Sequence, residues 1–304
     1  MEKNKISENT KNVFVSLVGK PNVGKSSILN ALVGEKVAIV TSKPQTTRTK
    51  ITGILTKNTI QYVFLDTPGI HNAKTKLGNR MVKETVGSIA DVDIGLMIFE
   101  PYGELTEAEN NLILDIKKQK LPTIAVINKI DTIKNEQDIL DRINLLNEFE
   151  IFENIIQTSV VTELGLEKLL NLISEYAMDG PHYFPEDSYT DMPEKALVAE
   201  ILREKMLLNL HDEIPHGIAI TVESFKERPN GKKIDIDINV YCERKSHKGM
   251  IIGKNGTMLN KIRTQARAEC ESFLDIRVDL KCWVKVKEDW RDNDFLLNDF
   301  GFNK

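Results

Sequence analysis

The sequence predicts two α/β domains in one chain of 304 residues. Apolar runs typical of buried strands alternate with helical patterns up to about Ala177, the order that builds a mostly parallel sheet with helices on both faces. A segment with three prolines and a glycine then interrupts the alternation, and a smaller α+β pattern follows it. We therefore predict a flexible arm, a first domain, a linker, a second domain and a C-terminal tail at residues 1–10, 11–178, 179–193, 194–288 and 289–304.

Composition limits the class of protein. A hydrophobic fraction of 41% supports real cores, and no apolar run approaches the length needed to span a bilayer. The opening residues lack the apolar core of a signal peptide. The three cysteines are odd in number and lack metal-ligand spacing, which suits a reducing cytoplasm. With a net charge of −4, any site for RNA must be a local basic patch.

The segment after the first predicted strand fits the phosphate-binding loop (P-loop) pattern Gly-x4-Gly-Lys-Ser. An apolar run at 13–18 predicts the strand before it, and residues 27–32 predict the start of a helix after it. Glycines let backbone N–H groups turn toward phosphates, and a helix N-terminus adds partial positive charge. Lys25 is then expected to reach the outer phosphates, and Ser26 to bind magnesium. The alternative is a plain glycine-rich turn. The predicted phosphate-binding residues are Gly19, Lys20, Pro21, Asn22, Val23, Gly24, Lys25, Ser26 and Ser27.

A second motif follows the strand predicted at 60–65. An aspartate at the carboxyl end of a buried strand can hold magnesium through water, and the Gly69 N–H can bond the terminal phosphate. Alone, Asp-Thr-Pro-Gly would be a common turn. The second switch is predicted at Asp66, Thr67, Pro68, Gly69 and Ile70.

A third motif, Asn-Lys-Ile-Asp, follows the strand predicted at 123–127. The Asp131 carboxylate can accept two hydrogen bonds from guanine, whereas adenine lacks both donors and would leave it unpaired. Asn128 can bridge the base and the phosphate loop, and the Lys129 stem can pack along the base. Asn-Lys-x-Asp resembles the guanine-recognition motif of the GTPase superfamily. Taken alone, the same residues could be a helix cap.

Two further loops extend the resemblance. Ser159 and Val160, after a short strand at 155–158, resemble the superfamily loop beside the base, with valine where alanine is usual. The polar segment 41–48 is expected to be the first switch, in which one threonine closes over magnesium when the terminal phosphate is present. We expect Thr47 in that role, with Thr46 as the alternative. The predicted first switch is Gln45, Thr46, Thr47 and Arg48.

These motifs together resemble the Era branch of translation-associated GTPases. Ile70 stands where Ras-like enzymes place a water-orienting glutamine, and a hydrocarbon cannot polarise water. Asn22 matches a position at which related GTPases use asparagine with a bound potassium ion. The resemblance therefore implies Mg²⁺ and K⁺ as cofactors and hydrolysis that potassium stimulates. We expect a slow intrinsic rate, about 10⁻⁴ to 10⁻² per second.

The second domain is predicted as a helix at 194–210, strands at 217–222 and 233–240, a helix–loop–helix, and a strand at 277–286. With Ile-Ile-Gly-x-x-Gly at the helix junction, this order resembles the type II KH fold, which binds single-stranded RNA.

The chemistry of that junction fits RNA. Glycines let the backbone approach phosphates, and the next helix offers its N-terminus to them. From residue 241 to 291 there are twelve Lys and Arg against seven Asp and Glu, so this stretch is basic in an acidic chain. We expect isoleucines to floor an apolar groove and cations to ring it. Gly-x-x-Gly alone is weak evidence for RNA binding, since turns that join two helices often need glycine. The predicted RNA-binding residues are Lys248, Ile251, Ile252, Gly253, Lys254, Asn255, Gly256, Lys261 and Arg263.

The resemblance to Era-type GTPases covers nearly the whole chain. It implies a GTP-hydrolysing switch that binds the small ribosomal subunit near the 3′ end of its RNA and assists 30S maturation. It also implies a monomer in the cytoplasm, with peripheral association with the inner face of the membrane. Two alternatives remain open: an RNA-binding assembly factor whose domain senses GTP without hydrolysing it, and a GTPase of the tRNA-modification type.

Overall fold

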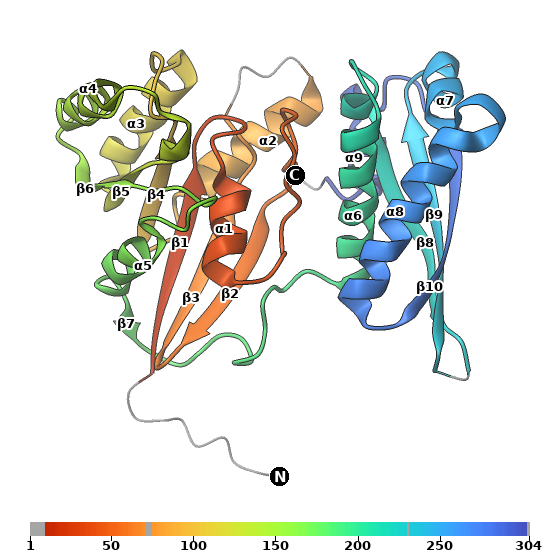
Figure 1. The fold of residues 1–304 in the computed structure, drawn as a ribbon, viewed down its shortest axis with the longest axis horizontal. Coiled ribbons are helices and arrows are strands. Elements are labelled where there is room, and N and C mark those ends of the chain that lie inside the picture. The colour runs from red at the N-terminus through yellow and green to blue at the C-terminus, as the bar shows by residue number, and fades with distance from the viewer. Residues whose placement is uncertain (1–9, 71–74, 230, 303–304) are drawn as a thin grey trace, which may run out of the picture. The chain divides into compact units, whose positions relative to one another are not determined.

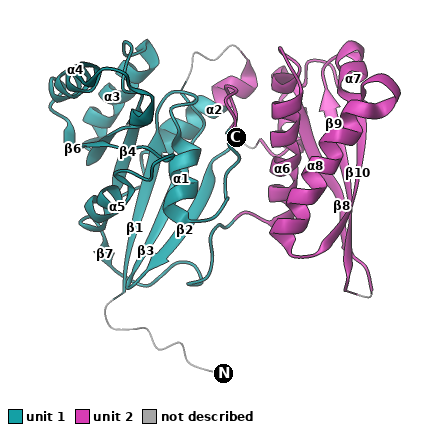
Figure 2. Ribbon diagram, in the orientation of Figure 1, with its two compact units in different colours: residues 1–40, 47–73, 81–191 teal, residues 41–46, 74–80, 192–304 magenta. Residues whose placement is uncertain are grey.

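The computed structural model describes residues 10–70, 75–229 and 231–302. The arm predicted at 1–10 therefore lies outside the described residues, apart from Thr10. The chain forms two compact units, coloured separately in Figure 2. Unit 1 comprises Met1–Val40, Thr47–Ala73 and Met81–Asp191, and unit 2 comprises Thr41–Thr46, Lys74–Arg80 and Met192–Lys304.

The first unit is built on one sheet (Figure 1). Only β2 and the short β7 run antiparallel to their neighbours, and the other pairings are parallel. The central strands β4 and β5 are buried along their whole length, as expected for parallel strands covered on both faces. The strand order is β2 (Ile51–Lys57), β3 (Ile60–Asp66), β1 (Lys11–Val18), β4 (Ile94–Phe99), β5 (Thr123–Ile127) and β6 (Phe152–Gln157), with β7 (Met178–Asp179) beside the start of β1.

Helices alternate with these strands. One face of the sheet packs through Met97 and Phe99 against Leu112 and Ile113 of α3 and Leu146 of α4. The sequence sets where α3 begins, because Thr106 and Glu109 cap it reciprocally. The helices are α1 (Lys25–Val33), α2 (Lys76–Gly87), α3 (Glu107–Gln119), α4 (Glu136–Asn147) and α5 (Leu166–Ser174), with a 3₁₀ turn η1 (Ile130–Thr132).

Four predicted motifs follow strands that run parallel in this sheet. The phosphate loop follows β1, Asp66 ends β3, the guanine motif follows β5, and Ser159 comes after β6. Parallel strands place their carboxyl ends along one edge, where α/β sheets bind ligands. The topology therefore collects residues from distant parts of the chain into one crevice.

The first part of the segment predicted as a linker packs against unit 1. Gln61, fully buried in β3, accepts hydrogen bonds from Tyr183 N (2.7 Å) and Phe184 N (3.0 Å), and its Nε2 donates to Phe184 O (2.9 Å). Farther along, Ile54 N of β2 donates to Tyr189 O at 2.8 Å. This segment is therefore held by specific hydrogen bonds.

The second unit holds a three-stranded sheet in the order β10-β9-β8, with α6, α7 and α8 (Figure 1). Strand β9 is antiparallel to β8 and parallel to β10. Ile236 and Ile238 of β9 face a core that Ile262, Ala266 and Cys270 of α8 complete at helical spacing. The elements are α6 (Glu194–Asn209), η2 (Pro215–Gly217), β8 (Ala219–Glu227), β9 (Lys233–Cys242), α7 (Lys245–Ile252), η3 (Lys254–Gly256), α8 (Thr257–Leu274), β10 (Arg277–Val286), η4 (Trp290–Asp292) and α9 (Asp294–Asp299).

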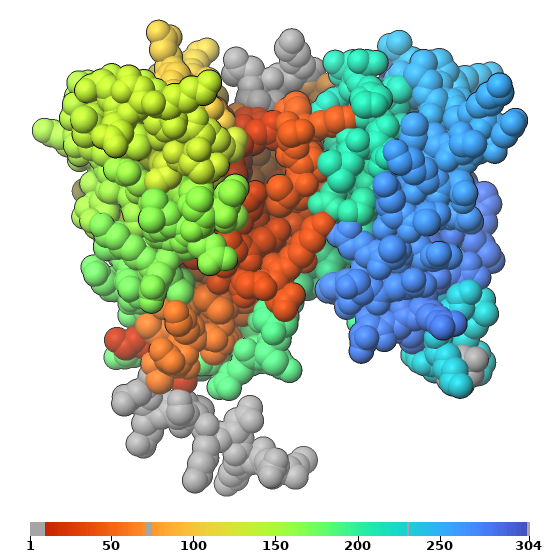
Figure 3. Space-filling view, in the orientation of Figure 1, coloured from red at the N-terminus to blue at the C-terminus, as the bar shows by residue number. Residues whose placement is uncertain are grey.

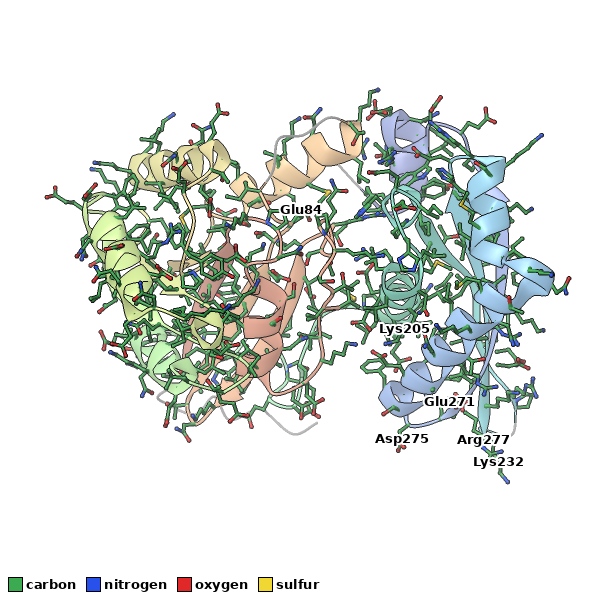
Figure 4. All side chains as sticks on the ribbon, turned by 45° about the horizontal axis from the view of Figure 1, so that its top comes forward. Glu84, Lys205, Lys232, Glu271, Asp275 and Arg277 are labelled. Carbon is green, nitrogen blue, oxygen red and sulfur yellow. The ribbon has the colours of Figure 1, made fainter. Side chains whose placement is uncertain are left out.

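Polar contacts fix helix α8 at its C-terminal end. The Glu271 carboxylate accepts a hydrogen bond from Val278 N (3.0 Å), which ties the helix to the start of β10. Lys205 of α6 forms ion pairs with Glu204 and with Glu269 of α8. Figure 4 labels Glu271 near the end of α8 and Lys205 on α6. These contacts hold the helical layer in register with the sheet.

The C-terminal tail packs on the second unit. Trp290 is fully buried, its Nε1 donates to Gly217 O (3.0 Å), and Phe300 stacks on Tyr241 with ring centroids 4.5 Å apart. The tail therefore packs on the domain that precedes it. Within the described residues, no helix is long and apolar enough to cross a membrane.

Candidate nucleotide site and nucleic-acid groove

The loop between β1 and α1 has a backbone that requires glycine at two positions. Gly19 has φ of 149°, and a Cβ there would lie 2.5 Å from Ile98 O. Gly24 has φ of 103°, and a Cβ there would lie 2.2 Å from Asn128 Nδ2. Side chains at either place would clash with β4 or with the guanine motif. The loop is therefore packed closely enough to present its backbone to a ligand.

Lys25 is buried within the loop that precedes it. Its Nζ donates to Gly19 O (3.2 Å) and to Lys20 O (3.1 Å). Burial lowers the pKa of Lys25 to about 8, although the nearby Asp66 acts in the opposite direction. A buried ammonium with so little compensating charge is a strong attractor for an anion such as phosphate.

Three predicted magnesium ligands come together at the end of β3. Ser26 Oγ donates to Asp66 Oδ2 (2.5 Å) and lies 3.0 Å from Thr47 Oγ1, which itself lies 3.3 Å from Asp66 Oδ2. Thr46 is engaged elsewhere, since its hydroxyl donates to Lys43 O and lies 2.7 Å from the hydroxyl of Thr41. The geometry therefore brings Thr47, and not Thr46, to the carboxylate.

The donor set at Asp66 fits a hard cation. Asp66 is fully buried, and its Oδ1 has no hydrogen-bond partner among the described residues. Burial raises the pKa of Asp66, opposed by Lys25 and by the hydroxyls of Ser26 and Thr47. A carboxylate beside two hydroxyls is the all-oxygen set that Mg²⁺ prefers. An ion reached through water would satisfy the remaining oxygen.

The residues of the second motif close over the loop. Thr67 Oγ1 donates to Leu17 O (2.7 Å), and Ile70 N donates to Gly19 O (3.1 Å). A Cβ on Gly69 would lie 2.6 Å from Pro21 N. The Ile70 side chain is 7% exposed and belongs to the core cluster beneath β4. Ile70 thus contributes packing where a water-orienting side chain could otherwise stand.

The guanine motif is anchored to the phosphate loop. Asn128 Nδ2 donates to Val23 O (2.9 Å), and Thr158 Oγ1 donates to Asn128 Oδ1 (3.2 Å). Ser159 Oγ donates to Asp131 Oδ1 (2.6 Å), so that serine orients the carboxylate predicted to bind guanine. Val160 follows Ser159 and is half-buried. Sequence reasoning missed Thr158, which was predicted only as the last residue of a short strand at 155–158.

A second missed residue is Glu100, which follows β4. Its carboxylate pairs with Lys20 (2.9 Å) and with Lys129 (3.0 Å), and Lys129 Nζ also donates to Asn22 O. Those two lysines lower the pKa of Glu100 against the opposing effect of its partial burial. Nothing in the local sequence distinguishes this glutamate from other charged residues near strand ends.

In the second unit, the Gly-x-x-Gly turn joins α7 to α8. Gly253 and Gly256 have φ of 75° and 78°, and a Cβ on Gly253 would lie 2.7 Å from Met258 Cβ. The residues between them, Lys254 and Asn255, are exposed. The turn therefore offers its backbone and one lysine to solvent at the N-terminus of α8.

An open pocket of about 380 Å³ lies beside this turn, between α8 and the edge strand β10. It brings together Gly256 and Arg263 from the predicted set, while Ile251, expected to floor the groove, is wholly buried and does not line the pocket. Ile252 is half-buried against the core, Lys248 is also half-buried, and Lys261 is exposed. Figure 3 shows the surface of this unit, on which α8 lies in blue. The lining residues are Gly256, Leu259, Asn260, Arg263, Lys281, Cys282 and Trp283.

The contribution of β10 to this pocket was not anticipated. Lys281 and Trp283 are exposed and alternate with the buried Leu280 and Val284, so their side chains project from the face of β10 opposite the core. A tryptophan between two lysines in the strand predicted at 277–286 was the available signal. An open groove with cations and an aromatic ring suits single-stranded nucleic acid.

Comparisons with known proteins agree with both units. The family model of 50S ribosome-binding GTPases matches residues 14–129, and the KH-domain model matches residues 213–291. GTPase Era of Clostridium perfringens (strain ATCC 13124) is 46% identical over 294 residues, 97% of this chain and 99% of that protein. GTPase Era of Clostridioides difficile (strain 630) is 43% identical over 293 residues, 96% of this chain and 99% of that protein.

Two solved structures match the fold. Era in complex with MgGDPNP and nucleotides 1506–1542 of 16S ribosomal RNA has a TM-score of 0.93 at 35% identity, covering 97% of this chain and 100% of that one. An Aquifex aeolicus Era variant bound to GDP·AlF4⁻ has a TM-score of 0.92 at 35% identity, with the same coverage. The predicted fold class, a P-loop GTPase domain followed by a KH domain, is confirmed. The chain belongs to the family of Era GTPases.

Proposed function

We propose that this chain is a GTP-hydrolysing switch that binds small-subunit ribosomal RNA near its 3′ end and assists maturation of the 30S subunit. The observation that carries the proposal is the presence, in one chain, of a guanine-nucleotide crevice and a KH groove. A related Era was solved with MgGDPNP and nucleotides 1506–1542 of 16S ribosomal RNA, which supports both ligands. Membership of this family sets aside a GTPase of the tRNA-modification type.

In the proposed nucleotide complex, the loop backbone from Gly19 to Ser27 and the Lys25 ammonium hold the phosphates. The Gly69 N–H bonds the terminal phosphate. Asp131 accepts two hydrogen bonds from guanine, oriented by Ser159, and Asn128 links the base site to the loop. The first switch, residues 45–48, closes over the ion and the second, residues 66–70, senses the terminal phosphate.

Magnesium, when bound, neutralises charge that develops on the phosphate oxygens. We propose Ser26 and Thr47 as direct ligands and Asp66 as a ligand through water. The convergence of these three side chains supports the assignment, and Thr46 is disfavoured because its hydroxyl is already bonded within its own loop.

We propose that potassium stimulates hydrolysis and that intrinsic turnover is slow, about 10⁻⁴ to 10⁻² per second. Ile70 is packed in the core and cannot orient water, so the transition state needs charge from elsewhere. Asn22, in the loop, is the proposed potassium ligand. Phosphate release should be several-fold faster in potassium chloride than in sodium chloride at equal ionic strength, and Asn22→Ala should remove the difference. Equal rates in the two salts would reject the idea.

For RNA, we propose that the Gly253–Gly256 turn contacts backbone phosphates and that the α8–β10 pocket accepts unstacked bases. Lys254 and Arg263 supply positive charge at the two ends of this site. The wider proposed set is Lys248, Ile251, Ile252, Gly253, Lys254, Asn255, Gly256, Lys261 and Arg263.

A binding experiment tests the RNA half of the proposal. The double variant Lys254→Gln, Arg263→Gln should weaken binding of a single-stranded 16S 3′-end oligonucleotide by about tenfold or more and reduce the salt slope by about two. The control Lys226→Gln, Arg277→Gln removes the same charge from exposed positions outside the pocket and should bind normally. Unchanged binding by the first variant would contradict the groove assignment.

Hydrolysis distinguishes a switch from an assembly factor that only senses GTP. Wild-type protein should release phosphate from GTP in the presence of magnesium, and Lys25→Ala should abolish nucleotide binding. Tight GTP binding without phosphate release, in potassium and with RNA present, would favour the non-hydrolysing alternative.

The remaining proposals concern the domain bounds, which rest on sequence patterns, and the oligomeric state and location, which rest on family resemblance. We propose that residues 11–178 act as the GTPase domain, 179–193 as linker, 194–288 as RNA-binding domain and 289–304 as tail. We also propose a monomer in the cytoplasm that touches the inner face of the membrane peripherally. Sedimentation velocity and co-sedimentation with anionic vesicles test these last two points.

A further inference from the structure

Glu100 occupies an unusual place in the nucleotide crevice. It is the first residue after β4, and the phosphate loop passes directly over this strand end, because a Cβ on Gly19 would lie 2.5 Å from Ile98 O. The guanine motif follows the neighbouring strand β5, and Asn128 N donates to Phe99 O at 2.9 Å. Glu100 therefore stands at the junction of the phosphate loop and the guanine motif.

Its carboxylate joins these two segments. One oxygen, Oε2, lies 2.9 Å from Lys20 Nζ of the loop, and the other, Oε1, lies 3.0 Å from Lys129 Nζ of the guanine motif. The Lys129 ammonium also donates to Asn22 O, so it is held by an anion and a carbonyl together. Only 22% of the Glu100 side chain is exposed, so water screens these pairs less than it would on an open surface.

The segment after Glu100 is itself held in place. Arg142 of α4, 5% exposed, donates to Gly103 O and is influenced electrostatically by Glu100 and Glu109. Lys20 and Lys129 thus pair with this carboxylate, and Arg142 adds an electrostatic influence. The position of the carboxylate is determined by packing and not by a flexible loop alone.

We infer that Glu100 is a positioning residue for guanine-nucleotide binding, acting through Lys129. With its ammonium fixed by Glu100 and Asn22, the Lys129 side chain spans from the guanine motif to the phosphate loop. Its methylene stem then forms a prearranged surface for the base, and the rotamer entropy of a lysine is lost before the ligand arrives. This inference rests on the proposed binding of guanine nucleotides.

The test is a double-mutant cycle on GDP dissociation, measured by stopped flow with a ribose-labelled fluorescent GDP. Glu100→Gln keeps the shape and removes the charge, and it should speed dissociation about three- to tenfold. Lys129→Met keeps the stem and removes the ammonium, and adding Glu100→Gln to it should change the rate no further. In Lys20→Met protein, by contrast, Glu100→Gln should retain its effect.

Glu104→Gln is the matched control, since it makes the same charge change on an exposed residue four positions along the chain. If Glu100 had a purely structural role, Glu100→Gln would change the dissociation rate by the same factor in Lys129→Met protein as in wild-type protein. That result would overturn the inference. So would wild-type dissociation in Glu100→Gln protein. If wild-type protein failed to bind GDP at all, the proposed function itself would fail, which is a different outcome.

Discussion

Asp131 is the side chain that we propose selects the base. Ser159 Oγ donates to its Oδ1 at 2.6 Å, which fixes the plane of the carboxylate next to a rigid strand end. An ionised carboxylate can only accept hydrogen bonds, and this one can accept two from guanine. Selection therefore depends on the acceptor character of Asp131 and on its fixed direction.

Asp131→Asn should reverse this preference. The amide would donate to the 2-carbonyl of xanthine and would meet the guanine amine with a donor of its own. We expect GDP affinity to fall about a hundredfold or more and xanthosine diphosphate to become the better ligand, as competition against labelled nucleotide would measure. Asp91→Asn, an exposed site at the end of the segment before β4, is the control. Retained GDP preference would remove Asp131 from the base site.

The thiols of Cys270 and Cys282 are expected to be unreactive in the folded protein. Burial raises the pKa of both thiols to about 12 from 9.0. The thiolate is the nucleophile, so alkylation by iodoacetamide at pH 8 should be about a thousandfold slower than in unfolded protein. Mass spectrometry after timed quenching measures it. Cys282 is informative because it lines the open pocket, so rapid labelling there would contradict the shift.

The same shift has a consequence for stability. The pKa values of these thiols are higher in the folded protein than in the unfolded protein. Their contribution to the stability of the folded state is therefore fully present below pH 9, where the thiols are neutral. That contribution is lost as pH rises from 9 toward 12. Stability of the second unit should therefore decline over this alkaline range.

At the scale of elements, the sequence predicted strands correctly where apolar residues are continuous, as in β5, or alternate regularly, as in β10, and it erred where pairing decides the bounds. The strands predicted at 123–127 and 277–286 agree with β5 and β10. The strand predicted at 217–222 is β8 at Ala219–Glu227, because Pro215 begins a 3₁₀ turn and pairing with β9 extends the strand through polar residues. Cross-strand pairing between distant residues leaves no local pattern.

The candidate site residues follow the same rule: local patterns are visible in the sequence, whereas contacts between distant residues are not. Motif residues such as Lys25, Ser26 and Asp131 could be proposed from the sequence because their spacing is local. Glu100 and the β10 lining were not, since their roles depend on elements that come together only in the fold. The choice between Thr46 and Thr47 likewise needed the hydrogen bonds of a folded loop.

Gln61 holds the predicted linker against strand β3. It is fully buried and makes three hydrogen bonds to the backbone of Tyr183 and Phe184. Gln61→Leu would leave those backbone groups unpaired and should cost about 1–3 kcal/mol of stability, with faster chymotrypsin cleavage between residues 183 and 189. Gln119→Leu, at the exposed end of α3, is the control. A cleavage rate equal to wild type would mean that the linker is held by other contacts.

At the scale of the whole molecule, the question is whether nucleotide state reaches the RNA groove. Thr41–Thr46, next to the proposed magnesium ligand Thr47, belongs to the same compact unit as the KH domain. A loop that orders over magnesium would thus alter a segment of that unit.

We expect RNA affinity to differ at least about fivefold between protein bound to a GTP analogue and protein bound to GDP. Filter binding with a fixed salt concentration measures this, because phosphate contacts make affinity steeply salt-dependent. Thr47→Ala should bring the two affinities together. Identical affinities in wild-type protein would reject coupling while leaving both binding activities intact.

The packed linker has one more consequence, for association between chains. Strand β2 ends the sheet, and a bare edge strand can pair with another molecule and start aggregation. Here Ile54 N is bonded to Tyr189 O, and Thr190 Oγ1 donates to Thr52 O at 2.6 Å, so the chain covers its own edge. A GTPase fragment ending at residue 177 would lose this cover, whereas one ending at 191 would keep it. We therefore expect the segment that joins the two units to hinder pairing of the first unit with its own copies.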